Sequence, residues 1–241
     1  MKREKIGLKL RLKQIKIILF KDIKSEVRQI NDLFSIFLFD MISIFIFSSA
    51  YNFSTQNQNM PIEIFVIEIW LIIFFTLIFI MTKIFVKEKD SGTLGGLLTA
   101  PVSGNVILLS KILYCLILIS FIEIVLFLFS VFISSPSIGN LNATQIFVYI
   151  GLGVILPTID LSICGSIVSA FSMYVKNKSF VLPVLLFPLI LPIITPVISI
   201  NLKLLGGEVL SNLIYEIVFL IAHIILMISI LTLISQVLLY D

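Results

Sequence analysis

Four ionisable side chains interrupt apolar runs in which charge is otherwise rare: Asp40, Glu123, Asp160 and His223. A charged group inside a bilayer is costly, so such residues often mark a substrate or ion path or a proton relay. Each could instead be a hydrogen-bonded packing residue, with its carboxyl protonated. A lone histidine could ligate a metal ion, but it cannot form a histidine cluster, and we expect no metal site.

The sequence contains no motif for catalysis or nucleotide binding. It has no Gly-x-x-x-x-Gly-Lys-Ser/Thr loop for phosphates, no nucleophile elbow and no His-Glu-x-x-His. The two cysteines, Cys115 and Cys164, lie far apart within apolar runs, which is typical of packing residues. We therefore expect no catalytic residue, no directly bound cofactor and no nucleic-acid partner.

One polar, glycine-containing stretch, residues 87–101, has a pattern that suits docking to a partner. Charges come first, then a glycine, then leucines at helical spacing, then a proline: Glu88, Asp90, Gly92, Leu94, Leu97, Leu98 and Pro101. We predict a short amphipathic helix at about 90–101. A segment this short has no hydrophobic core of its own, and its leucines should therefore contact lipid or another protein. The alternative is a solvated loop with incidental leucines.

The composition indicates an integral membrane protein. Of the 241 residues, 59% are hydrophobic and only 13% are charged, whereas about a quarter of a soluble domain is charged. The mean hydropathy is +1.16. Because a spanning helix needs about 20 apolar residues, we predict an all-α transmembrane domain over residues 33–241. Its six spans are expected at about 33–53, 62–86, 106–133, 145–175, 180–200 and 213–240.

Two of these spans contain residues that break helices. The fourth is expected to be broken by Gly151, Gly153 and Pro157, and then continues through small residues that suit close packing. The fifth has prolines at positions 183, 188, 192 and 196. We predict an interrupted helix at 188–196 that lines an external vestibule or, if two copies of the chain pair, the interior of that dimer.

The N-terminal segment is strongly basic. Residues 1–31 hold ten of the seventeen lysines and arginines. Apolar residues recur among them at three- and four-residue steps: Ile15, Ile18, Leu19, Ile23, Val27 and Ile30. We predict that residues 1–32 form an amphipathic helix on the cytoplasmic lipid surface. A basic tail that only sets the topology is the alternative.

The positive charges also predict the orientation. With six spans, sixteen of the seventeen lysines and arginines fall on one side, and Lys203 alone falls on the other. By the positive-inside rule, both termini and residues 87–101 should be cytoplasmic. Cysteines placed at Asn57, Asn140 and Gly207 should then react with an external reagent, and one at Ser91 should not.

Three stretches resemble the haem exporter protein B family, CcmB. The first is Phe20-Lys21-Asp22-Ile23-Lys24-Ser25-Glu26-Val27-Arg28. The second is the acidic-Gly-x-Leu-x-x-Leu-Leu-x-x-Pro pattern of residues 88–101, with Lys111 following, and the third is the proline-rich fifth span. The resemblance covers nearly the whole chain. It departs at Gly95, where many relatives have an acidic residue.

The resemblance implies a type-2 ABC exporter permease without its own ATPase. Two copies would pair with two CcmA-like ATP-binding subunits, and the stretch at 90–101 would be the coupling helix that docks on them. A CcmC-like haem-handling membrane protein and a CcmE-like haem chaperone would be further partners in a prokaryotic inner membrane. The function would be haem export or ATP-driven release of the loaded chaperone. A drug or polysaccharide permease and a non-transporting scaffold are the alternatives.

Overall fold

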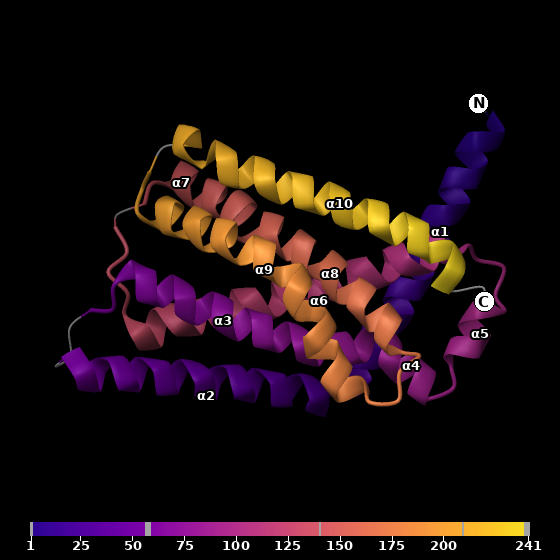
Figure 1. Cartoon of the computed structure of the whole chain (residues 1–241), viewed down its shortest axis with the longest axis horizontal. Helices are drawn as coiled ribbons and strands as arrows, with labels where there is room; N and C mark the ends of the chain where they lie inside the picture. Colours follow the sequence, from indigo (N-terminus) through magenta and orange to yellow (C-terminus); the bar gives the residue numbers. More distant parts are fainter. Residues whose placement is uncertain (1, 56–58, 140, 209, 239–241) are drawn as a thin grey trace.

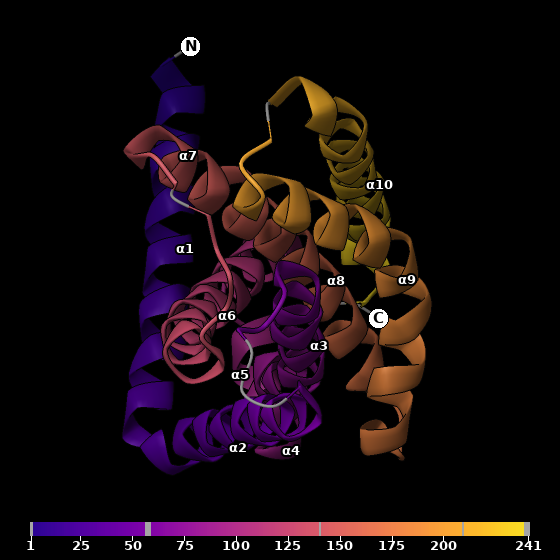
Figure 2. The same ribbon diagram turned by 90° about the vertical axis from the view of Figure 1, so that its left-hand side faces the viewer.

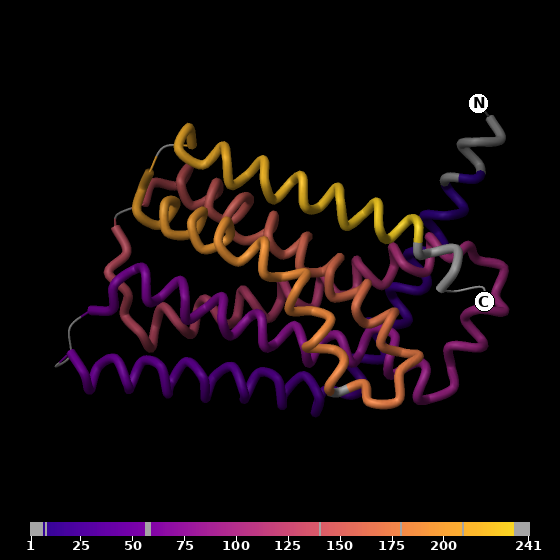
Figure 3. The backbone as a smooth tube through the Cα atoms, in the orientation of Figure 1, coloured from indigo at the N-terminus to yellow at the C-terminus, as the bar shows by residue number. Residues whose placement is uncertain are grey.

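The computed structural model describes residues 2–55, 59–139, 141–208 and 210–238. Within these residues the chain is a bundle of helices (Figures 1 and 3). In chain order they are α1 (Lys2–Arg28), α2 (Ile30–Thr55), α3 (Ile62–Met81), the π-helix η1 (Thr82–Val86), α4 (Lys87–Asp90), α5 (Leu94–Leu98), α6 (Gly104–Ser134), α7 (Ala143–Val148), the π-helix η2 (Tyr149–Ile155), α8 (Leu156–Ser172), α9 (Lys178–Leu205), the 3-10 helix η3 (Leu210–Leu213) and α10 (Ile214–Leu238).

Six helical segments of the described chain are long and apolar enough to cross a membrane: Ile30–Thr55, Ile62–Asp90, Gly104–Ser134, Ala143–Ser172, Phe180–Leu205 and Leu210–Leu233. The predicted all-α fold with six spans is therefore confirmed. The second segment continues to Asp90 and the fifth to Leu205, both beyond the expected ends. Residues 239 and 240, the expected end of the sixth span, lie outside the described residues.

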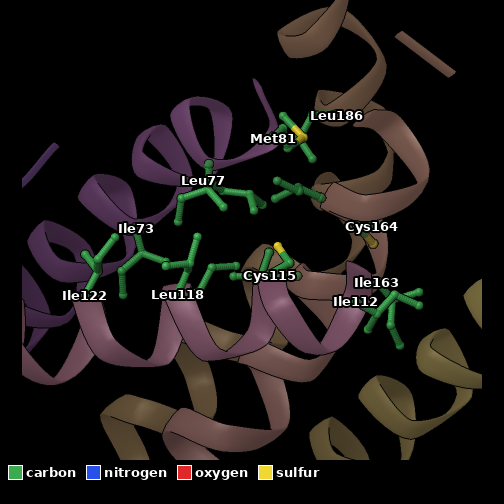
Figure 4. Close-up of a cluster of buried hydrophobic side chains, with 14 of the residues drawn as sticks. Ile73, Leu77, Met81, Ile112, Cys115, Leu118, Ile122, Ile163, Cys164 and Leu186 are labelled. Atoms are coloured by element: carbon green, nitrogen blue, oxygen red, sulfur yellow. The ribbon is translucent and has the colours of Figure 1, made fainter. Parts of the chain in front are cut away.

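Helix α8 packs closely against α3 because it presents small residues. A Cβ atom added at Gly165 would come within 2.8 Å of Leu77 Cδ1 and 3.4 Å of Met81 Cγ. Figure 4 shows Leu77 and Met81 in the buried cluster to which Cys164 and Cys115 also belong. Lipid tails are as apolar as leucine, so such close packing is a main source of attraction between spans.

The π-helix η1 is stabilised by a side chain from α8. In an α-helix the Phe85 N–H would donate to the Met81 carbonyl. Here the Ser169 hydroxyl stands between them, because it donates to Met81 O at 2.7 Å and accepts from Phe85 N at 3.1 Å. The wider turn leaves no orphan backbone group at this point. It also sets the rotation of the residues that follow, which lead into α4.

The expected break in the fourth span is wrong. Its path stays helical through α7, η2 and α8, and residues Gly151 and Gly153 lie in the π-helix η2. Pro157 closely follows the π-helix, and a widened turn accommodates the missing N–H and the ring of a proline inside a continuous helix. These residues therefore lead to a locally wider, π-helical turn and do not end the helix.

The interruption predicted in the fifth span is also wrong, because α9 is one continuous helix with all four prolines inside it. Its buried face, which includes Leu186, Ile190 and Ile193, packs against α3 and α8. Pro188 and Pro192 are on the exposed side, so their rings do not disturb that packing. A proline's fixed φ is itself compatible with a helix, and α9 continues as a bent helix through all four positions (Figure 3).

Helix α1 lies across one end of the bundle, transverse to the spans (Figures 1 and 2). It packs along α6 through a face that includes Ile15, Ile18, Asp22 and Glu26, all buried. Val27 is exposed, although it was expected to share the apolar face. One face of α1 is therefore covered by protein and contains two carboxylates, whereas Ile17 and Phe20 remain exposed, so the contact of this helix with the lipid surface stays a prediction.

Figure 1 places α1, α4 and α5 at one end of the bundle and α7 at the other. The first end, which we call the charged end, carries the basic groups of α1, η1, α4 and the first turns of α6. Lys203 lies far from it, beside Glu216, with Nζ 2.6 Å from Oε1. The positive-inside rule predicts that the charged end faces the cytoplasm.

Cysteine labelling tests this orientation. Asn57 and Asn140 lie outside the described residues, and Gly207 is exposed but has a φ of +78° that a cysteine rarely adopts. The exposed Glu208 therefore serves as the external position, and Ser91 marks the charged end. We expect Glu208→Cys to react with an impermeant maleimide in intact cells, and Ser91→Cys to react only after permeabilisation. Cys115 and Cys164 are buried and give a low background. Labelling of Ser91→Cys from outside would reverse the orientation.

Candidate functional site: an ion-pair cluster at the charged end

Four charged side chains from three helices form a closed ring of ion pairs at the charged end. Lys111 Nζ, near the start of α6, lies 2.9 Å from Asp22 Oδ2 of α1 and 3.0 Å from Glu88 Oε1 of α4. Lys21 Nζ lies 3.1 Å from Asp22 Oδ1 and 2.5 Å from Glu88 Oε1. Two cations thus balance two anions. We call Lys21, Asp22, Glu88 and Lys111 the charge ring.

The charge ring is largely buried. The side chain of Lys111 is 1% exposed and that of Asp22 is 7% exposed, whereas Lys21 is half exposed. Burial works against the charge of Lys21, but the hydrogen bond to Glu88 and the charge of Asp22 outweigh it and raise the pKa of Lys21. The Lys111 ammonium also lies 5.7 Å from the centroid of the Phe85 ring. Removing one member would leave a buried charge without its partner.

A second set of contacts extends the charge ring toward α2. Glu26 of α1 pairs with Lys83 of η1 and accepts a hydrogen bond from the Tyr114 hydroxyl at 2.9 Å. Lys87 Nζ lies 3.2 Å from Asp32 Oδ2 at the start of α2. Helix α1 is therefore fastened to η1, α4 and α6 together, so these elements should move as one body.

The residues predicted to dock a partner divide into a polar group, which makes contacts within the chain, and a group of leucines on α5. Glu88 is 12% exposed and its Oε1 atom is occupied by two lysines, so it holds α4 in place. Asp90 is exposed and pairs with Lys178 at the start of α9. Gly92 has a φ of +71° in the turn between α4 and α5, a conformation that favours glycine. Both acidic residues thus have partners within the chain.

Helix α5 covers Leu94–Leu98 only, about half the length predicted. Leu94 is 3% exposed, so the expectation that all three leucines need an outside partner is wrong for this residue. Leu97 and Leu98 are half-buried at the edge of the core. The segment after α5 is held by Gln14 of α1, whose Nε2 donates to Pro101 O at 3.1 Å. Leu97 and Leu98 keep apolar surface that a partner could cover.

Among the intramembrane polar residues, Asp160 and His223 are brought together. His223 Nδ1 of α10 lies 2.9 Å from both carboxylate oxygens of Asp160 on α8, and Cys164 Sγ lies 3.8 Å from Oδ1. These ligand atoms are within 4.8 Å of one another, a spacing that a metal ion could bridge. The three side chains already satisfy one another, so the contact also joins α8 to α10 without an ion.

Asp40 and Glu123 each meet a threonine on a neighbouring helix. Thr76 Oγ1 donates to Asp40 Oδ1 at 2.6 Å, and Thr158 Oγ1 lies 2.6 Å from Glu123 Oε2. In each carboxyl the second oxygen is buried and has no hydrogen-bond partner among the described residues. All three intramembrane acids therefore face protein. Within the described part of the chain, neither Asp40 nor Glu123 forms a hydrogen bond or ion pair with Asp160 or His223; each is paired with its own threonine.

Several residues of the cluster had no role assigned from sequence: Asp22, Glu26, Lys83 and Tyr114. One signal was present, because Asp22 and Glu26 continue the helical spacing of Ile15 and Ile18 on a helix that is otherwise basic. Glu68 was also overlooked. It is fully buried, and Ser134 Oγ lies 3.2 Å from its Oε2 atom at the opposite end of the bundle.

Comparison with known proteins gives one family match. The family model described as CcmB protein matches residues 13–236, nearly the whole chain. The matched range contains all four residues of the charge ring and all six spans up to residue 236. No curated protein and no solved structure matches the chain.

Proposed function

The chain belongs to the CcmB protein family, and from this premise we propose that it is the non-catalytic permease subunit of a cytochrome c maturation ABC transporter. Two copies would bind two CcmA-like ATP-binding subunits, which hydrolyse ATP. A CcmC-like membrane protein and a CcmE-like chaperone would supply and receive haem on the opposite side of the membrane. In this assembly haem is a handled ligand and not a resident cofactor of this chain.

One observation supports the mechanical part of the proposal: the charge ring fixes α4 to α1 and α6. The segment α4–α5 directly joins the second span to the third. A force applied at α5 by an ATPase would reach both spans, because Glu88 and Lys111 tie the ends of those spans together. Closure of the ATPase would then rotate this end of the bundle as a body.

We propose that α5, with Leu97 and Leu98, is the docking element for the ATPase. Its two leucines lie beside the exposed residues Ser91, Thr93 and Thr99. An apolar edge with a polar rim is the usual composition of a protein interface. Helix α1 lies on the same end and would limit how far the ATPase can approach along the membrane.

Expression in a strain that lacks its own permease tests the proposal. We expect the chain, supplied with its CcmA-like partner, to restore haem-loaded c-type cytochromes, measured by haem staining. Tagged chain should co-purify with the ATPase subunit and with the haem-handling protein. Co-purification with an ATPase alone, without restored cytochromes, would instead favour a permease for another substrate. A chain that binds no ATPase would be a scaffold.

A further inference from the structure

A cavity of about 720 Å³ lies in the half of the bundle away from the charge ring. Side chains of α3, α6, η2 and α9 surround it. Ile138 and Leu141, in the loop between the third and fourth spans, close one side. The walls are almost entirely apolar. A cavity of this size can hold a lipid chain or a lipophilic small molecule.

The mouth of the cavity opens between α6 and the η2 region. Ile124, Leu128, Ile146 and Ile150 line it and are 45–64% exposed on the outer surface of the bundle. These residues belong to membrane-spanning segments. A ligand can therefore enter sideways from the hydrocarbon of the membrane, without crossing an aqueous channel.

Among the described residues, the cavity is lined by one carboxyl group, that of Glu123, which is 4% exposed. Its Oε2 atom is 2.6 Å from the Thr158 hydroxyl, but that hydroxyl is also 2.6 Å from Val154 O and has a single proton to donate. Its Oε1 atom is buried and has no hydrogen-bond partner among the described residues. A buried carboxyl oxygen without a donor is costly, so this site lacks a hydrogen-bond donor.

Two further polar side chains line the cavity. Asn201 is held by its amide, which donates to Gly153 O at 3.0 Å and to Val197 O at 2.9 Å. The π-helix η2 places Tyr149 against Phe127, with ring centroids 5.7 Å apart. π-helical turns often occur at functional sites. Here the turn brings Tyr149, Ile150 and Val154 to the cavity wall together.

We propose that this cavity binds a lipophilic molecule with a protonated amine or a similar donor head, with the head at Glu123 and the chain along Trp70 and Phe127. The head would supply the donor that Oε1 lacks, and a charge-assisted hydrogen bond inside an apolar wall is strong. A carboxylate head offers only acceptors and cannot supply the donor that Oε1 lacks, so it is disfavoured. The site is separate from the charge ring and does not depend on the proposed function.

The only tryptophan of the chain, Trp70, lines the cavity and reports on occupancy. We would titrate purified protein in nanodiscs with bromododecylamine, whose terminal bromine quenches tryptophan fluorescence on contact. Bromododecanoic acid and bromododecanol are the matched probes for head charge and for membrane partitioning. We expect the amine to quench at about tenfold lower membrane concentration than the acid, with the alcohol between them.

Glu123→Gln should remove the preference for the amine, a weakening of about tenfold. Asp40→Asn is the control, because it alters a buried carboxyl that does not line the cavity. Trp70 also lines an apolar groove against α9 that contains no ionisable group. Quenching through that groove would be the same for amine and acid and would not depend on Glu123.

A second variant keeps the test decisive if Glu123→Gln does not fold. Ile150→Phe enlarges a side chain at the mouth and should reduce quenching by all three probes. Equal quenching by amine and acid in the parent protein would overturn the proposal. A preference that survives in Glu123→Gln, or quenching that is unchanged in Ile150→Phe, would overturn it as well, as would a second copy of the chain that blocks the mouth.

Discussion

Replacement of Lys111 by methionine is expected to lower the free energy of unfolding by about 3–5 kcal/mol. Lys111 is 1% exposed and contacts both Asp22 and Glu88. Its removal leaves two carboxylates facing each other, with only the half-exposed Lys21 between them. Detergent-induced unfolding in mixed micelles measures the change. The variant should also lose the coupling between ATP hydrolysis and cytochrome maturation.

Two controls test whether the loss of stability in Lys111→Met comes from the unpaired carboxylates of the charge ring. Lys178→Met breaks an ion pair whose partner, Asp90, is 59% exposed, so the loss should stay within about 1 kcal/mol. Adding Asp22→Asn and Glu88→Gln to Lys111→Met removes both stranded charges and should recover most of the lost stability. Equal effects of Lys111→Met and Lys178→Met would show that the charge ring does not hold the charged end together.

The double change Leu97→Glu and Leu98→Glu should abolish co-purification of the ATPase subunit. Fully burying a leucine contributes about 1.5–3 kcal/mol; docking would cover roughly half of each side chain, so the loss of both would weaken docking by about tenfold to a hundredfold, and the two added charges would weaken it further. Both leucines are only partly covered by the permease, so the glutamates can reach water and the permease itself should still insert and pair. Affinity purification followed by ATPase assay measures the outcome.

The matched control is Ser91→Glu with Thr99→Glu, which adds the same charge at exposed positions beside α5. It should leave the ATPase bound. Leu94→Glu is expected to behave differently, because Leu94 is buried in the permease and its change should lower the yield of folded protein. An ATPase that stays bound to the double leucine variant at unchanged stoichiometry would refute docking through α5.

The number and type of the spans could be predicted because each is set by a local property, the length of an apolar run. Predictions from single residue types or local patterns were incomplete where contacts with neighbouring helices determine the structure. The prolines of α9 predicted a break, but Pro188 and Pro192 face outward while the opposite face stays packed. Likewise, the amphipathic pattern of α1 predicted a lipid contact, and only the fold shows that α6 covers its inner face.

The site could be predicted only in part, for the same reason. The glycine-containing stretch at 87–101 indicated a short helix, and a short helix is present at Leu94–Leu98. Nothing local could show that Glu88 faces Lys21 and Lys111. The charge ring joins residues that are distant in sequence; Asp22 and Lys111, for example, are 89 positions apart. The Asp160–His223 contact likewise joins residues 63 positions apart on two different helices.

The 89-residue separation within the charge ring also has a consequence for biogenesis. A ribosome that adds about 5–20 residues per second makes Lys111 roughly 4–18 s after Asp22. For most of that interval α1 has neither α4 nor α6 to bind, and its basic residues can hold it on anionic lipid. Membrane-surface binding would then be the waiting state of the nascent helix, and closure of the charge ring would mark the insertion of the third span.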